Sequence, residues 1–158
     1  MSTSNWGLKS VSFWLVGVVT LLMLFLGVKG FITPEAAIRD FGLPLHDVTD
    51  KYLVHIKADR DLFIGIFLLA LMVLRMRKAM LVVMLTSIIM PVIDAILVIT
   101  NAVDKTPSWI HIVTAVYGLV VGWMLYREEQ GARIANTETT ISTKAATPKT
   151  ISSLEAQI

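Results

Sequence analysis

The sequence contains no cysteine, which excludes disulfide bonds, thiolate metal sites, thiol nucleophiles and lipid-bearing cysteines. Charged residues are also scarce, at 16% of the 158 residues, whereas 55% of the residues are hydrophobic and the mean hydropathy is +0.71. Soluble domains do not combine so few charges with long unbroken apolar runs, which only lipid tolerates on a helix surface. We therefore expect an integral membrane protein whose first partner is the lipid bilayer.

Recognisable ligand-binding motifs are missing as well. The sequence has no glycine-rich phosphate loop, no metal-spaced pair of histidines and no internal repeat of the transporter kind. We expect neither a metal nor a cofactor. The net charge is +2, but the basic residues lie at the ends of apolar runs and near the C-terminus instead of forming one patch, so nucleic-acid binding is not expected either.

Four stretches are candidates to cross a membrane, whose hydrocarbon core of about 30 Å needs a helix of about 20 residues. They are Ser10–Val28, Lys51–Leu74, Ala79–Thr100 and Trp109–Tyr126. The first competes with a cleaved signal peptide, but no small-x-small cleavage site follows it. The second is continuously apolar only from Leu62 and must be completed by the charged residues 57–61. The prediction is an all-α, integral membrane four-helix bundle.

The segments outside these stretches have a different composition. Residues 33–50 contain Pro34, Gly42 and Pro44, which break helices, and we predict a loop at the membrane surface. Residues 1–130 then form the four-span transmembrane domain. Residues 131–158 are rich in threonine, serine, alanine and lysine and have little to bury, so the prediction is a disordered cytoplasmic tail.

Basic residues predict the orientation. Arg75, Arg77 and Lys78 lie in the tight turn between the second and third spans, and short loops rich in arginine and lysine stay in the cytoplasm. With four spans, both termini are then cytoplasmic. In a eukaryotic cell, the expected location is the endoplasmic reticulum membrane.

Ionisable residues fall in one layer across three of the spans. Measured from the basic residue at the cytoplasmic end of each span, at about 1.5 Å per residue, Asp61, Asp94 and His111 lie roughly 21, 24 and 24 Å deep. Arg60 is at the same height, and Lys57 precedes Asp61 by one helical turn on the same face. The layer lies in the outer half of the membrane.

A charge facing lipid costs a few kcal/mol or more, so we expect these side chains to point into the bundle. His111 shares a helix face with a stripe of small residues that allows close packing, namely Thr114, Ala115, Gly118 and Gly122. The face of Asp94 includes the polar residues Ser87 and Asn101. Pro91 is expected to kink this helix one turn before Asp94.

Two carboxylic acids near a fixed positive charge need not titrate together, so one can serve as a base while the other serves as an acid. Opening an epoxide needs this combination, and an access route from the bilayer would suit a lipophilic substrate. The candidate catalytic residues are Asp61, Asp94, Arg60 and His111, and the candidate substrate-binding residues are Lys57 and Asn101.

Short motifs give the chain a resemblance to known membrane proteins over roughly residues 8–127. They are Phe41-Gly42-Leu43-Pro44, Arg60-Asp61-Leu62, Pro91-Val92-Ile93-Asp94-Ala95 and His111. On these residues the chain resembles a family of small four-span membrane proteins known as a domain of unknown function. It also resembles small membrane hydrolases of fungal polyketide pathways, such as aurovertin and citreoviridin biosynthesis. That second resemblance implies epoxide opening in the biosynthesis of a secondary metabolite.

Two other functions fit the same layer of charges. In a proton-coupled carrier, the carboxylates would load and release protons, and four spans without a repeat would require a homodimer. In a structural or assembly protein, the charged groups would pair only to fix the packing of the helices.

Overall fold

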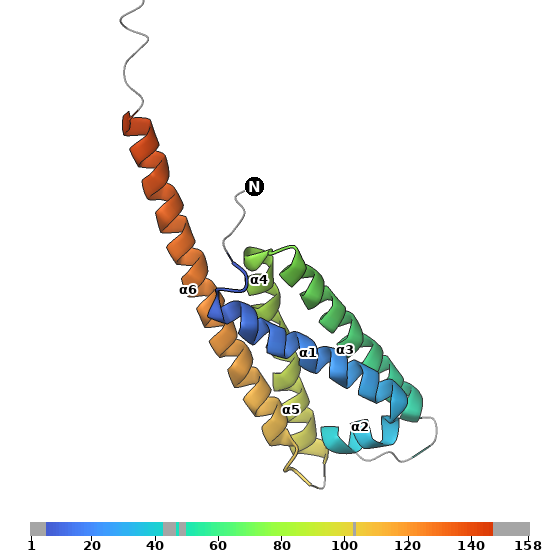
Figure 1. The fold of residues 1–158 in the computed structure, drawn as a ribbon. Helices are drawn as coiled ribbons and strands as arrows, with labels where there is room; N and C mark the ends of the chain where they lie inside the picture. Colours follow the sequence, from blue (N-terminus) through green and yellow to red (C-terminus); the bar gives the residue numbers. More distant parts are fainter. Residues whose placement is uncertain (1–5, 43–46, 48–49, 103, 147–158) are drawn as a thin grey trace, which may run out of the picture.

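The computed structural model describes residues 6–42, 47, 50–102 and 104–146, and this part of the chain is helical with no strand. The helices are α1 (Val11–Ile32), α2 (Pro34–Phe41), α3 (Asp50–Val73), α4 (Arg77–Ser87), α5 (Ile89–Asn101) and α6 (Ser108–Ala146). Figure 1 shows α1 and α3 side by side, with α4 and α5 following one another alongside α6. The predicted all-α class is confirmed.

Three of the helical segments are long and apolar enough to cross a membrane. They are α1, the combined α4 and α5 (Arg77–Asn101) and most of α6 (Ser108–Lys144). These segments fit a multi-pass membrane protein. Helix α3 has 24 residues, which is also a membrane-spanning length, but its charged residues 57–61 distinguish it from the other three.

Helices α1 and α3 pack with their backbones in close contact. A Cβ atom added to Gly30 would lie 2.5 Å from the Cβ of Ala58, and one added to Gly27 would lie 2.7 Å from the backbone nitrogen of Leu62. No side chain fits at either position, so the two glycines set the distance between the helices.

The third predicted span is interrupted between α4 and α5. Pro91 has no N–H to donate to the Ser87 carbonyl one turn earlier, and α4 ends at Ser87. The next backbone contact is long, with 3.4 Å between Val92 N and Ile88 O. The predicted interruption at Pro91 is confirmed.

The stripe of small residues on α6 forms a packing face, as predicted. A Cβ added to Gly122 would lie 2.6 Å from the Leu85 side chain, and one added to Gly118 would lie 3.2 Å from Ile88. His111 and Ala115, on the same face, are buried.

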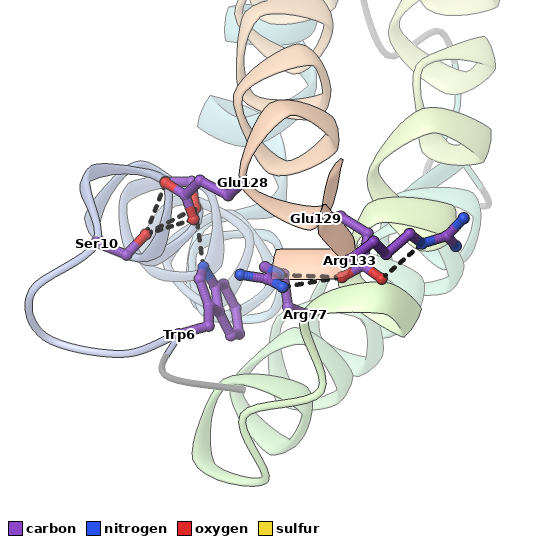
Figure 2. Close-up of polar contacts among 7 residues, drawn as sticks. Trp6, Ser10, Arg77, Glu128, Glu129 and Arg133 are labelled. Carbon is purple, nitrogen blue, oxygen red and sulfur yellow. Dashed lines mark hydrogen bonds and ion pairs between the residues drawn. The ribbon is translucent and has the colours of Figure 1, made fainter. Parts of the chain in front are cut away.

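One end of the bundle, which we call the core end, comprises residues 6–12, the α3–α4 turn and residues 125–129 of α6. Buried side chains extend from it into the middle of the bundle: Trp6, Val16, Leu68, Leu71, Met72, Met80, Met84, Val121 and Leu125. Figure 2 shows the polar groups there, with Glu128 facing Ser10 and Trp6 and with Glu129 between Arg77 and Arg133. The Glu128 carboxylate accepts hydrogen bonds from the hydroxyls of Ser10 and Ser12, and the Ser12 hydroxyl also accepts one from the Trp6 indole at 2.8 Å.

At the opposite end, which we call the cavity end, α2 lies across the bundle (Figure 1). The predicted loop is therefore wrong for residues 34–41. Pro34 occupies the first turn, where its missing N–H has no partner to lose, and Gly42 ends the helix in the left-handed region at φ 103°. Pro34 and Gly42, which were expected to break a helix, are instead the two ends of a short one. Leu43 and Pro44 lie outside the described residues.

The predicted disorder from residue 131 onward is wrong for residues 131–146. Helix α6 has 39 residues and extends beyond the rest of the bundle (Figure 1). Threonine hydroxyls in this extension donate to carbonyls four residues earlier, at Arg133, Ala135, Asn136 and Thr139, so these side chains are satisfied within the helix. Residues 147–158 lie outside the described part of the chain.

Candidate functional site

The cavity end contains a cavity of about 330 Å³ whose walls come from all six helices. Most of the lining side chains are apolar, including Leu22, Leu26 and Ile64. Four ionisable residues of α3, α5 and α6 also line it, namely Lys57, Asp61, Asp94 and His111. An apolar cavity with a few convergent polar groups is typical of a small-molecule site.

Asp61 forms an ion pair within its own helix. Its Oδ2 lies 2.6 Å from the Nζ of Lys57, one turn earlier, and the Asp61 side chain is 10% exposed. The Lys57 ammonium also lies 5.1 Å from the centre of the Phe41 ring, which is within the range of a cation–π contact. The carboxylate oxygens of such a pair only accept hydrogen bonds.

His111 lies between α2 and Asp94. Its Nε2 is 3.2 Å from the backbone carbonyl oxygen of Phe41, and its Nδ1 is 4.0 Å from Oδ2 of Asp94. A carbonyl oxygen only accepts hydrogen bonds, so Nε2 carries a hydrogen and donates it. Nδ1 therefore faces the Asp94 carboxyl group.

The second pair differs chemically from the first. A neutral imidazole with its hydrogen on Nε2 has an acceptor at Nδ1, and an ionised Asp94 also has only acceptors. Two acceptors repel each other, so the approach of Nδ1 and Oδ2 is favourable when a proton or a bridging water lies between them. The charges of Lys57 and Asp61 act on Asp94 across the same cavity. The cavity thus combines one carboxyl group paired with an ammonium group and a second that faces an imidazole.

The structure brings together the predicted layer of Asp61, Asp94 and His111, together with Lys57. The expectation that Arg60 points into the bundle is wrong. Arg60 is exposed, does not line the cavity and forms no ion pair with a described residue. The physical reason is the helical rotation of about 100° per residue, which directs Arg60 away from the face of Asp61. Lys57, one full turn away, supplies the positive charge instead.

Asn101 does not join the site either. Its side chain is exposed at the end of α5, where the amide donates to the Leu97 carbonyl oxygen at 2.9 Å and to the Thr100 hydroxyl at 2.8 Å. Asn101 lies nearly two turns beyond Asp94, past the lining of the cavity. The predicted contact between Asn101 and a substrate has no support in this geometry.

Sequence reasoning missed the contribution of α2. Asp40 is bound by Lys29 of α1, and the hydrogen bond from Lys29 lowers the pKa of the Asp40 carboxyl below its usual range. Glu35 lies 2.7 Å from Lys51 of α3, and the hydrogen bond from Lys51 lowers the pKa of Glu35 in the same way. The two ion pairs join α2 to the α1–α3 pair. A proline followed eight residues later by a glycine was the signal for this helix.

Comparison with known proteins assigns the chain to a family. A family described as a domain of unknown function, DUF4267, matches residues 20–125. The chain belongs to this family. The matched range contains Lys57, Asp61, Asp94 and His111 of the cavity and the whole of α2. No curated protein and no solved structure matches the chain, so the resemblance to polyketide hydrolases gains no support from these comparisons.

Proposed function

We propose that the cavity is the active site of a membrane-embedded hydrolase or cyclase that opens an epoxide in a lipophilic, polyketide-like metabolite. The observation that carries the proposal is that two of the carboxyl groups lining one largely apolar cavity have unlike partners. Asp61 is paired with an ammonium group, and Asp94 is paired with an imidazole. Epoxide opening needs a base and an acid together, and these pairs provide one of each.

The proposed reaction moves one proton at each pair. Asp61 takes a proton from a water molecule, or from a substrate hydroxyl in a cyclisation, while that oxygen attacks one epoxide carbon. The carbon–oxygen bond of the ring breaks, and its oxygen takes a proton from the Asp94–His111 pair. The product is a diol or a cyclic ether with a new hydroxyl. Transfer of the proton from Asp61 back to the Asp94–His111 pair restores the starting state.

Lys57 has a supporting role in this proposal. Its ammonium holds the Asp61 carboxylate at 2.6 Å and is itself in the cavity wall, so it is also within reach of a bound polar group of the substrate. The apolar remainder of the wall suits the carbon skeleton of a molecule that partitions into the bilayer. We therefore propose a lipophilic substrate and no cofactor.

The proposed topology has four spans, because α3 is added to the three apolar segments. Both termini are then in the cytoplasm. It rests on Arg75, Lys78 and Arg127, which are exposed at the core end. In a eukaryotic cell, the protein would be in the endoplasmic reticulum membrane. A protease-cleavable tag placed after Ile158 should be cut from the cytoplasmic side of sealed membranes. Protection of that tag would overturn this topology.

A purely structural role is the second candidate. The Lys57–Asp61 pair is complete within α3 and needs no ligand to satisfy it, although a pair within one helix does not fix how the helices pack. A proton-coupled carrier is less well supported, because the buried side chains of the core end close the bundle beyond the cavity. A carrier would require a second conformation, and, with so few spans, a homodimer.

The deciding experiment uses Asp61→Asn and Asp94→Asn, with Asp59→Asn as the matched control, since Asp59 is an exposed acid on the same helix as Asp61. Cells lacking the gene should accumulate a lipophilic epoxide. That epoxide is then supplied to purified protein in lipid nanodiscs with ¹⁸O-labelled water. We expect each site variant to lose about 100-fold to 10,000-fold in turnover at unchanged melting temperature, and Asp59→Asn to retain full turnover.

Two results would overturn the proposed function. One is a metabolite profile that does not change when the gene is removed. The other is full turnover in both folded site variants. If neither variant folds, while Asp59→Asn does, the structural role is favoured instead.

A further inference from the structure

The C-terminal end of α2 does more than cover the cavity. We propose that Phe41 is the positioning residue of the site, because its backbone carbonyl fixes the tautomer of His111 and so directs Nδ1 to Asp94. The role in catalysis rests on the proposed function, whereas the tautomer itself does not. A hydrogen bond that fixes one ring nitrogen of histidine decides which nitrogen is left for chemistry.

The first step of the argument is the confinement of the imidazole. His111 is 9% exposed, its Nε2 is 3.2 Å from the Phe41 oxygen, and the two rings meet edge to face with centres 4.6 Å apart. A flip of the imidazole would exchange its nitrogens with its carbons, and both polar contacts would be lost. The hydrogen bond to the backbone therefore selects the orientation and the tautomer together.

The second step is the fixed position of the Phe41 carbonyl. Gly42, the next residue, has φ 103°, and a Cβ atom there would lie 2.8 Å from Cβ of Pro107 and 3.1 Å from Cγ1 of Val98. Only glycine fits this backbone conformation and this contact. The end of α2 thus rests directly on α5 and on the turn before α6. Asp40 holds the same end to Lys29 of α1.

The third step links α2 to the other half of the site. The Phe41 ring lies against Lys57, which holds Asp61, while its carbonyl holds His111, which faces Asp94. One residue of α2 therefore touches both pairs. Displacement of the end of α2 would release His111 and expose the cavity at the same time, so the proposed proton transfer requires α2 to be in place.

The test measures the ring nitrogens of His111 by ¹⁵N NMR. The sequence has three histidines, and His46→Gln with His55→Gln leaves His111 as the only one. In this background we expect the hydrogen of the neutral imidazole on Nε2. Gly42→Ala should displace the Phe41 carbonyl and give a mixture of tautomers. Gly131→Ala is the matched control, because nothing lies within 4 Å of an added Cβ there, and it should leave the spectrum unchanged.

A second variant separates the carbonyl from the ring. Phe41→Leu removes the aromatic contacts with Lys57 and His111 but keeps the backbone carbonyl, so the tautomer should persist if the hydrogen bond fixes it. With the epoxide as substrate, Gly42→Ala should lower kcat by about 10-fold to 100-fold with a smaller change in KM, since the loss lies in proton transfer.

The outcomes distinguish this inference from the proposed function. A hydrogen on Nδ1 in the starting protein overturns the inference even if every variant fails to fold. An unchanged tautomer in folded Gly42→Ala overturns it too. If the tautomer behaves as expected but Asp61→Asn and Asp94→Asn retain full turnover, the positioning by Phe41 stands and the proposed enzyme falls.

Discussion

The Lys57–Asp61 pair of the cavity end is built differently from the main polar contacts of the core end. At the core end, polar contacts join different helices: Arg77 of α4 lies 3.1 Å from Glu129 of α6, and Glu128 of α6 binds the start of α1. At the cavity end, the Lys57–Asp61 pair joins one turn of α3 to the next. An interhelical pair fixes how helices sit together, whereas a pair within one helix leaves them free to separate.

This difference explains why the cavity lies where it does. The core end is filled by large apolar side chains and closed by interhelical hydrogen bonds. At the cavity end, α2 supplies the links between helices that the Lys57–Asp61 pair does not. They are the ion pairs with Lys29 and Lys51 and the contact between Gly42 and Pro107. The bundle therefore separates most of the contacts that stabilise it from the Lys57–Asp61 pair of the proposed site.

The largest expected effect on stability comes from the core end. Leu125 is fully buried, and Leu125→Ala should lower the free energy of unfolding by about 2 to 5 kcal/mol, because it leaves a void among packed side chains. Leu22→Ala, in the cavity wall, should cost much less, since Leu22 is 38% exposed. Unfolding by SDS in mixed micelles measures both. Equal losses would contradict the separation of the two ends.

The second largest expected difference in stability is between variants of the ion pairs at the two ends of the bundle. Glu129→Gln leaves the Arg77 guanidinium, whose side chain is 9% exposed, without its carboxylate, and should destabilise the protein by about 3 kcal/mol. Asp61→Asn leaves the Lys57 ammonium, whose side chain is 28% exposed, and should therefore destabilise the protein less. The same unfolding assay compares them. A greater loss from Asp61→Asn would show that the cavity residues hold the bundle together.

Much of the candidate site was predictable, because distance along a helix gives depth in a membrane. Counting residues from the basic ends placed Asp61, Asp94 and His111 at one height, and they line one cavity. The direction of side chains was harder to predict. Arg60 immediately precedes Asp61, and the helical rotation of about 100° per residue directs it away from the site. The charge of Arg60 was visible in the sequence, but which cation would meet Asp61 depended on that rotation.

The segments outside the four apolar stretches were predicted least well. Pro34 and Gly42 were read as breakers of any helix, although each is favourable at one helix end, and α2 lies between them. Trp6 precedes the first span, where an interfacial position would be ordinary, but it is 1% exposed at the core end. Such long-range contacts depend on how the helices meet, which local composition does not encode.

The smallest expected effect is a pH dependence confined to the cavity end. The hydrogen bond from Lys29 lowers the pKa of Asp40, so the carboxylate favours the attached position of α2 above its ordinary pKa of about 3.9. That contribution is lost as the pH falls from this value through the lowered pKa.

A spin label at Ala36→Cys, the only thiol in the chain, should become more mobile below about pH 4. Asp40→Asn should raise its mobility at neutral pH and reduce the response to acid. A label on Leu8→Cys, at the core end, should report no such change over the same range. If both labels respond alike, acid loosens the whole bundle and not α2 alone.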